Sequence, residues 1–156
     1  MNVKSILLVE DDPRDAQLTL AALEEGKLPH DVVVVHDGAE ALDYLYCRKK
    51  FIQREGGNPT LILLDNKMPK VSGLSVLKTI KADENLKMIP VVALTSSRET
   101  QDLVEFYKNG VNAYVVKPVK FAEFTTAVEQ VGLFWTAINE APPVPVAKAT
   151  DLANQV

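Results

Sequence analysis

The fold is decided by residues 6–13, whose sequence is ILLVEDDP. The first four side chains are apolar with no polar residue between them, which indicates a β-strand buried on both faces. Three acidic residues and a proline follow at once, and an Asp-Pro pair is typical of a helix that begins at the proline. Residues 6–13 therefore predict a buried strand that leads directly into a helix.

The same unit recurs four more times along the chain. Each further apolar run precedes an amphipathic stretch of helical length and is also expected to be covered on both faces. The runs are 32–35 (VVVV), 61–64 (LILL), 91–94 (VVAL) and 113–116 (AYVV). Because parallel strands need crossover connections, these units predict a doubly wound α/β domain with a five-stranded parallel sheet flanked by five helices. The flavodoxin-like strand order 2-1-3-4-5 fits five such units with right-handed crossovers.

Capping residues and glycines mark the expected helix boundaries. We expect helices from Pro13 to Gly26, from Gly38 to about Arg48, from Ser72 onward, from a cap at Ser96 or Ser97 to Asn109-Gly110, and from Lys120 onward. The inward face of the third helix is predicted at Leu74, Leu77 and Ile80, and that of the last helix at Phe121, Phe124, Val128, Val131, Trp135 and Ile138.

Two segments fall outside the regular units. Residues 49–59 make an unusually long link into the third strand and predict a surface loop. Residues 139–156 are rich in Pro, Ala and Val and predict a flexible tail. The remaining chain, 1–138, is expected to form one domain, with no room for a second.

The composition narrows the classes of function. The chain has 156 residues, 47% of them hydrophobic, and a formal net charge of -4 at pH 7. That length suits one globular domain, and the acidic charge argues against nucleic acid as a direct partner. The single Cys47 cannot form an intramolecular disulfide, and no apolar run has the roughly 18 residues of a membrane span. We therefore expect a cytoplasmic protein without membrane association.

Polar residues follow four of the five predicted strands, at the edge of the sheet where ligands bind in such folds. Taken singly they have ordinary explanations, such as helix capping for the acids after the first strand. Carboxylates brought together resist ionisation unless a cation lies among them, and Mg²⁺ prefers such oxygen ligands. The set therefore predicts a Mg²⁺ site opposite an ammonium group. Its members are Glu10, Asp11, Asp12, Asp65, Thr95, Lys117 and Pro118.

As an ordered set, these residues resemble the receiver domain of two-component response regulators. The resemblance covers about residues 3–138 and implies the flavodoxin-like receiver fold. The motifs that carry it are Val9-Glu10-Asp11-Asp12, Leu63-Leu64-Asp65 with Met68-Pro69 and Gly73, Leu94-Thr95-Ser96, and residues 114–118 (YVVKP).

The resemblance implies a role for each acidic residue. Asp65 would be the phosphoacceptor, which attacks a phosphohistidine on a partner sensor histidine kinase. Asp11 would bind Mg²⁺ directly and Glu10 directly or through water, with Asp65 and the backbone carbonyl of Lys67 as further ligands. Such an arrangement suits phosphoryl transfer, which gains mainly from in-line positioning and from neutralised charge on the equatorial oxygens.

The resemblance also implies how the signal would be transmitted. Lys117 and Thr95 would contact phosphoryl oxygens, because new negative charge on Asp65 would draw both inward. Tyr114 would move inward behind Thr95, and the fourth helix, fifth strand and fifth helix would be the remodelled surface. The alternative for Tyr114 is a half-buried strand aromatic without a switching role.

The resemblance also draws attention to two positions that border the path of the hydrolytic water in this family. Lys67 stands two residues after Asp65, and Ser97 two residues after Thr95. Lys67 either shields the phosphoryl group or faces solvent, so the lifetime of the phosphorylated form stays open. Other residues expected to border the site are Asp12, Ser96 and Pro118.

A narrower resemblance concerns the partners. Residues 132–135 (GLFW), the Pro69-Lys70 pair and the long link 49–59 are similar to stand-alone receivers of bacterial phytochrome-type histidine kinases. This resemblance implies a bilin-carrying kinase as partner and a homodimer through the fifth strand and fifth helix. Leu133 and Phe134 lie off or crowd the inward stripe of the last helix, so we expect them in an apolar contact surface. Output would then pass through an unidentified downstream protein or through self-association.

Two other classes of function stay open. One is a small Mg²⁺-dependent phosphohydrolase, because haloacid-dehalogenase-type phosphatases also use an Asp at a strand end. Those enzymes need a second acid two residues later, where this chain has Lys67, and the P-loop and dinucleotide-binding motifs are absent. The other is a receiver-like docking scaffold that is never phosphorylated. Otherwise we expect no enzymatic activity beyond the chain's own phosphorylation and dephosphorylation.

Overall fold

Five parallel strands form one sheet, in a computed structural model that describes residues 4–26, 30–55 and 57–143. The strand order is β2-β1-β3-β4-β5, as the sequence predicts. The register aligns Val9 of β1 with Val35 of β2 and with Leu64 of β3, so these strands end side by side. The strands are β1 (Lys4–Val9), β2 (His30–Val35), β3 (Leu61–Leu64), β4 (Val91–Thr95) and β5 (Ala113–Val116).

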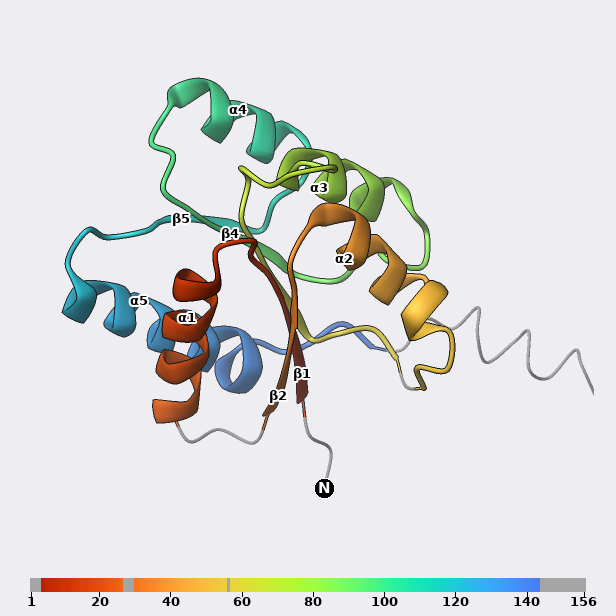
Figure 1. Cartoon of the computed structure of the whole chain (residues 1–156), viewed down its shortest axis with the longest axis horizontal. Helices are drawn as coiled ribbons and strands as arrows, with labels where there is room; N and C mark the ends of the chain where they lie inside the picture. Colours follow the sequence, from red (N-terminus) through yellow and green to blue (C-terminus); the bar gives the residue numbers. More distant parts are fainter. Residues whose placement is uncertain (1–3, 27–29, 56, 144–156) are drawn as a thin grey trace, which may run out of the picture.

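Helices cover both faces of the sheet (Figure 1). Helices α1 and α5 lie on one face, and α2, α3 and α4 lie on the other. This arrangement confirms the doubly wound α/β fold. The helices are α1 (Pro13–Glu25), α2 (Gly38–Leu45), α3 (Gly73–Ala82), α4 (Thr100–Lys108) and α5 (Phe121–Leu133), with a short 3₁₀ turn η1 (Lys49–Phe51) and a π-helical turn η2 (Phe134–Ile138).

The core is divided by the sheet into two halves, because successive strand side chains point to opposite faces. In β1, Leu7 and Val9 pack with α2, α3 and α4, whereas Ile6 and Leu8 pack with α1 and α5. The three central strands are buried along their length apart from the first two residues of β1. At 25 cal/mol per Å², burying one such Leu or Ile side chain contributes about 2 kcal/mol. The predicted double coverage holds for these strands.

The expectation that every strand is covered on both faces is wrong for edge strand β5. All four of its residues are only partly buried, and Val32, Val33 and Val34 of the other edge strand are partly buried as well. A strand at the edge of a sheet has a neighbour on one side alone, so the helices cover it less completely. An apolar run indicates a strand, but it does not show whether that strand is central.

Two predicted helix boundaries are wrong. Helix α2 ends at Leu45 rather than about Arg48, because Cys47 and Lys49 adopt positive φ angles of 54° and 55°, which a helix cannot contain. Helix α4 begins at Thr100, three residues after the predicted Ser97 cap. Ser97 is instead buried and hydrogen-bonded within the connection between β4 and α4.

Helix α5 uses a shorter inward stripe than predicted. Phe124 and Val128 are buried against β-strand residues and α1, but Phe121 and Ile138 at the two ends of the stripe are 62% and 61% exposed. At the end of the stripe, the π-helical turn η2 changes the helical period. Val131 and Trp135 also pack against this half of the core. The predicted inward face is therefore confirmed from Phe124 to Trp135 and is wrong at its two end residues.

The long link before β3 is more ordered than a simple surface loop. Its 3₁₀ turn places Phe51 edge-on against Tyr44, with ring centroids 5.1 Å apart, and the Arg54 guanidinium lies 4.2 Å from the centroid of the Tyr44 ring. The predicted tail is described as far as Pro143, and its residues 141–143 line a groove with residues 57–60, 85 and 88–90. The rest of the tail, 144–156, lies outside the described residues. None of the helices in the described ranges has the length and apolar content needed to cross a membrane.

Candidate functional site

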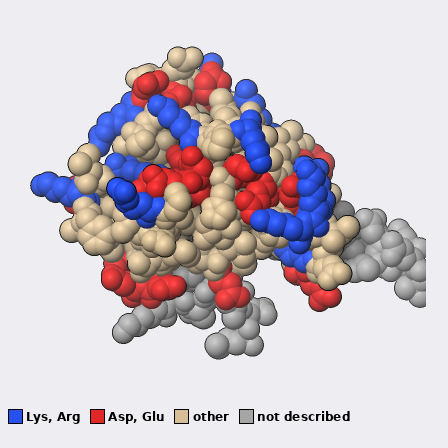
Figure 2. Space-filling view, viewed as in Figure 1, with Lys and Arg blue, Asp and Glu red and all other residues tan. Residues whose placement is uncertain are grey.

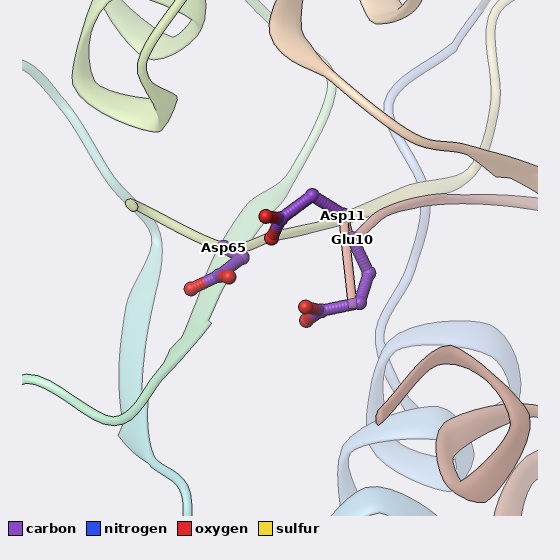
Figure 3. A group of neighbouring side chains, drawn as sticks. All are labelled: Glu10, Asp11 and Asp65. Atoms are coloured by element: carbon purple, nitrogen blue, oxygen red, sulfur yellow. The ribbon is translucent and has the colours of Figure 1, made fainter. Parts of the chain in front are cut away.

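Three carboxylates meet at the carboxyl edge of the sheet. One ligand oxygen from each of Glu10, Asp11 and Asp65 lies within 4.8 Å of the other two, and Figure 3 shows the three side chains converging from the ends of β1 and β3. Glu10 and Asp65 are buried, at 2% and 8% exposure, and Asp11 is the least buried of the three. The structure thus brings together acids that are up to 55 positions apart in the sequence.

The backbone explains why these side chains converge. The Glu10 N–H donates to the carbonyl of Val35 (3.0 Å), and the Asp65 N–H donates to the carbonyl of Val9 (3.1 Å). These bonds continue the ladders one residue beyond the strands and fix both acids. Asp12 caps α1, as predicted, because its carboxylate accepts hydrogen bonds from two N–H groups of the first turn (2.8 and 3.3 Å).

Burial makes these charges costly. Desolvation raises the pKa of Glu10 from 4.5 to about 7, although its hydrogen bond with Lys117 opposes the rise. Desolvation also raises the pKa of Asp65, with Lys117 opposing the rise and Asp11 adding to it. The ionised form of these buried carboxylates is therefore unfavourable. A divalent cation among their oxygens would stabilise the ionised form. The donor set of three carboxylates therefore fits a hard cation such as Mg²⁺.

Lys117 places a positive charge beside the carboxylates. Its Nζ lies 2.8 Å from Oε2 of Glu10 and 3.0 Å from Oδ2 of Asp15, and 10% of its side chain is exposed. Burial by itself would lower the pKa of Lys117, but the hydrogen bond to Glu10 and the charge of Asp65 outweigh burial and raise the pKa. Among the ion pairs of the described residues, Lys117 pairs with these two acids and not with Asp65.

A hydrogen-bond network links the end of β4 to α4 and β5. The Thr95 hydroxyl accepts from the Ser97 N–H (3.3 Å), and the Ser97 hydroxyl donates to Asp102 (2.5 Å). The Tyr114 hydroxyl donates to the carbonyl of Ser97 (3.1 Å), while its ring packs edge-on against Phe106, 5.5 Å between centroids. In this structure Tyr114 is thus a partly buried strand aromatic whose hydroxyl contacts the connection that follows Thr95.

The remaining predicted residues lie around this centre or away from it. The Lys67 and Ser96 side chains are exposed, and Lys117, Pro118 and Ser96 line a hollow of about 310 Å³ with residues of α1 and α5. Figure 2, viewed from the same side as Figure 1, shows acidic side chains gathered in the middle of this face of the molecule, with basic side chains around them. At the far end of α5 and outside this site, Leu133 and Phe134 are 44% and 45% exposed.

Two contributors to the site are missing from the sequence-based set. Asp15 binds Lys117, and Asp102 binds Ser97. The available signal was their position in the first turns of α1 and α4, but only the three-dimensional structure shows which side chain each one reaches.

The comparisons with known proteins agree with this geometry. Residues 6–129 match the family model described as the response regulator receiver domain. Response regulator Rcp1 from Synechocystis is 35% identical over 132 residues, 85% of this chain and 88% of that protein. Its solved structure in the Mn²⁺-bound form has a TM-score of 0.84 and covers 90% of this chain and 99% of that chain.

Two further solved structures are similar. The phosphorylated cyanobacterial phytochrome response regulator RcpA is 37% identical, with a TM-score of 0.86 over 91% of this chain and 100% of that chain. The bacteriophytochrome response regulator AtBRR is 55% identical, with a TM-score of 0.72 over 90% of this chain and 100% of that chain. The chain therefore belongs to the response regulator receiver domain family, and phytochrome response regulators are among its homologues.

Proposed function

We propose that the chain accepts a phosphoryl group on Asp65 from the phosphohistidine of a phytochrome-type sensor histidine kinase. The observation that carries this proposal is the convergence of Glu10, Asp11 and Asp65 beside the Lys117 ammonium. A carboxylate oxygen of Asp65 attacks phosphorus, the bond from phosphorus to the imidazole nitrogen breaks, and the electron pair leaves with the imidazole. The product is an acyl phosphate on Asp65.

Mg²⁺ is the cofactor that this proposal requires. The residues that would hold it are Glu10, Asp11 and Asp65, with the backbone carbonyl of Lys67, and the ion would neutralise charge on the phosphoryl oxygens. Metal binding by receivers is supported by the Mn²⁺-bound form of Rcp1.

Lys117 and Thr95 act on the phosphoryl group itself. The Lys117 ammonium stabilises negative charge on one equatorial oxygen, and the Thr95 hydroxyl donates a hydrogen bond to another. Thr95 now accepts a bond from the Ser97 N–H, so its own hydrogen is free to be donated. Tyr114 then follows Thr95, because both contact Ser97. The surface of α4, β5 and α5 transmits the change to a downstream protein.

The proposal extends to organisation and location. The receiver unit spans residues 1–138, with 139–156 as a tail, and it works in the cytoplasm without nucleic acid or membrane as partner. Leu133 and Phe134 form part of a homodimer surface at β5 and α5, which their exposure supports. The chain promotes only its own phosphorylation and dephosphorylation.

Acetyl phosphate and Mg²⁺ test the acceptor. The wild-type chain gains a labile phosphoryl group, detected as a mass increase that hydroxylamine removes, and Asp65→Asn gains none. Asp31→Asn, a change of the same charge at an exposed position in β2, serves as the control and is phosphorylated like wild type. An unmodified wild-type chain would favour the docking scaffold, and steady release of phosphate from small esters would favour the phosphohydrolase.

A further inference from the structure

Asp15 contacts the site from a different element than the other charged groups. It lies in the first turn of α1, whereas Glu10, Asp65 and Lys117 follow the ends of β1, β3 and β5. Its Oδ2 is 3.0 Å from Nζ of Lys117, and 35% of its side chain is exposed. Asp15 is thus an acid at the rim of the site. Among the ion pairs of the described residues, its one partner is the Lys117 ammonium.

The Lys117 ammonium is therefore paired with acids other than the acceptor. Its two partners are Glu10, at 2.8 Å, and Asp15, at 3.0 Å. Asp65 and Asp11 are not among the ion-pair partners of Lys117 in the described residues. Asp15 adds a second attraction toward α1.

We propose that Asp15 is a positioning residue that holds the Lys117 ammonium in a resting place and releases it when Asp65 becomes phosphorylated. This inference rests on the proposed function, because it assumes that Asp65 is the acceptor. A new phosphoryl group adds about 1.5 to 2 negative charges, which moves the most favourable place of the ammonium toward Asp65. Asp15 opposes that movement, since the ion pair must lengthen or break.

The exposure of Asp15 sets the size of the effect. Water reaches this end of the ion pair, so its strength is that of a solvent-exposed pair, equivalent to a change of about two- to fivefold in an equilibrium or a rate. Removing the carboxylate charge frees Lys117 to stabilise the phosphoryl group. Phosphorylation then becomes faster rather than slower.

A purely structural role for Asp15 predicts the opposite result. An acid in the first turn also stabilises α1 through the helix dipole, so its loss would lower stability and leave phosphorylation unchanged or slower. Acceleration that depends on Lys117 is therefore a result that helix stabilisation does not produce.

The experiment measures phosphorylation of the full chain by acetyl phosphate in Mg²⁺, together with the affinity for beryllofluoride by ¹⁹F NMR. We expect Asp15→Asn to react about two- to fivefold faster than wild type and to bind beryllofluoride more tightly. Asp15→Ser, which also suits a first helical turn, is expected to do the same. Glu123→Gln, which removes an exposed first-turn acid from α5, controls for net charge and behaves like wild type.

A Lys117→Gln background separates positioning from general electrostatics. Removing Asp15 has no effect on beryllofluoride affinity there if Asp15 acts through the ammonium. The same gain with and without Lys117, or no gain in either Asp15 variant, would overturn the inference while leaving Asp65 as the acceptor. A wild-type chain that takes up neither a phosphoryl group nor beryllofluoride would instead overturn the proposed function itself.

Discussion

Glu10 is the residue whose chemistry is most altered by its position. Desolvation raises its pKa to about 7, so near neutral pH a large share of the molecules carry a proton on a carboxylate that is proposed to bind metal. Protons and Mg²⁺ compete for the same oxygens. The pKa and the metal affinity are therefore coupled.

We predict that Mg²⁺ affinity increases as the pH rises from about 6 to about 8. Below the pKa of Glu10, its proton must leave before the oxygen can bind metal, which costs up to about tenfold in affinity per pH unit. Calorimetric titration in two buffers with different ionisation enthalpies measures both the affinity and the proton release. In Glu10→Gln the affinity is lower, and its dependence on pH is weaker. Equal wild-type affinity at pH 6 and pH 8 would contradict the prediction.

Sequence reasoning predicted most single residues of the site because strand ends share one edge of a parallel sheet. Glu10, Asp11, Asp65 and Lys117 meet there as expected. It did not predict the partner of Lys117 on α1, because Asp15 can reach the ammonium only through the way α1 packs against the sheet. Contacts between elements depend on packing, which a pattern along the chain does not contain.

At the scale of elements, the start of α3 is fixed by close backbone contact. A Cβ on Gly73 would lie 2.1 Å from the carbonyl oxygen of Asp65, and the Gly73 N–H donates to the carbonyl of Asn66 (2.9 Å). Helix α3 therefore begins directly against the segment that carries the proposed acceptor. Gly38, at the start of α2, is in similar contact with the backbone of Val71.

We predict that Gly73→Ala lowers the free energy of unfolding by at least about 2 kcal/mol, because two backbone segments must separate to admit the methyl group. Phosphorylation of Asp65 should slow as well, since its own carbonyl is the nearest obstacle. Urea unfolding measures the first effect. Gly57→Ala is the matched control, because a Cβ there meets nothing within 4 Å. The idea fails if the two variants are equally stable.

The elements show where sequence patterns lose accuracy. The existence of the five strands and five helices, and their succession along the chain, were predictable from apolar periodicity. The order of the strands in the sheet agrees with the flavodoxin-like order that fits right-handed crossovers. The end of α2 was not, because positive φ angles at Cys47 and Lys49 are unusual for those residue types. The start of α4 was misplaced because a Ser that bonds within a loop looks the same in sequence as a Ser that caps a helix.

At the scale of the whole molecule, the sheet order places the site and leaves a separate surface free. The acids follow central strands β1 and β3, whereas edge strand β5 contains Tyr114 and is followed by Lys117. Edge strand β5 is only partly buried, and α5 next to it exposes Leu133 and Phe134 at its far end. An exposed apolar surface at this end of α5 suits association of the chain with a second copy.

We predict that the chain forms a dimer that Phe134→Glu disrupts. Phe134 is 45% exposed and packs edge-on against Trp135, 5.1 Å between centroids, so a charge there would be desolvated on association. We expect the cost of desolvating this charge to weaken dimerisation at least about tenfold, or about 1.4 kcal/mol. Sedimentation velocity over a range of concentrations measures the change, and Leu133→Glu should have the same effect.

The control for this prediction is Ile52→Glu, which changes an even more exposed apolar residue, at 70%, next to the 3₁₀ turn that follows α2. If exposed apolar groups promoted association without specificity, this variant would also shift toward monomer. A specific surface at the end of α5 predicts that it sediments like wild type. Ile52 is exposed, so its change should alter the free energy of unfolding by no more than about 0.5 kcal/mol. Phe134→Glu also loses the contact with Trp135, so urea unfolding of this variant establishes that it is folded and that a lower sedimentation coefficient reports assembly. A wild-type chain that sediments as a monomer at every concentration, with and without beryllofluoride, would exclude the dimer.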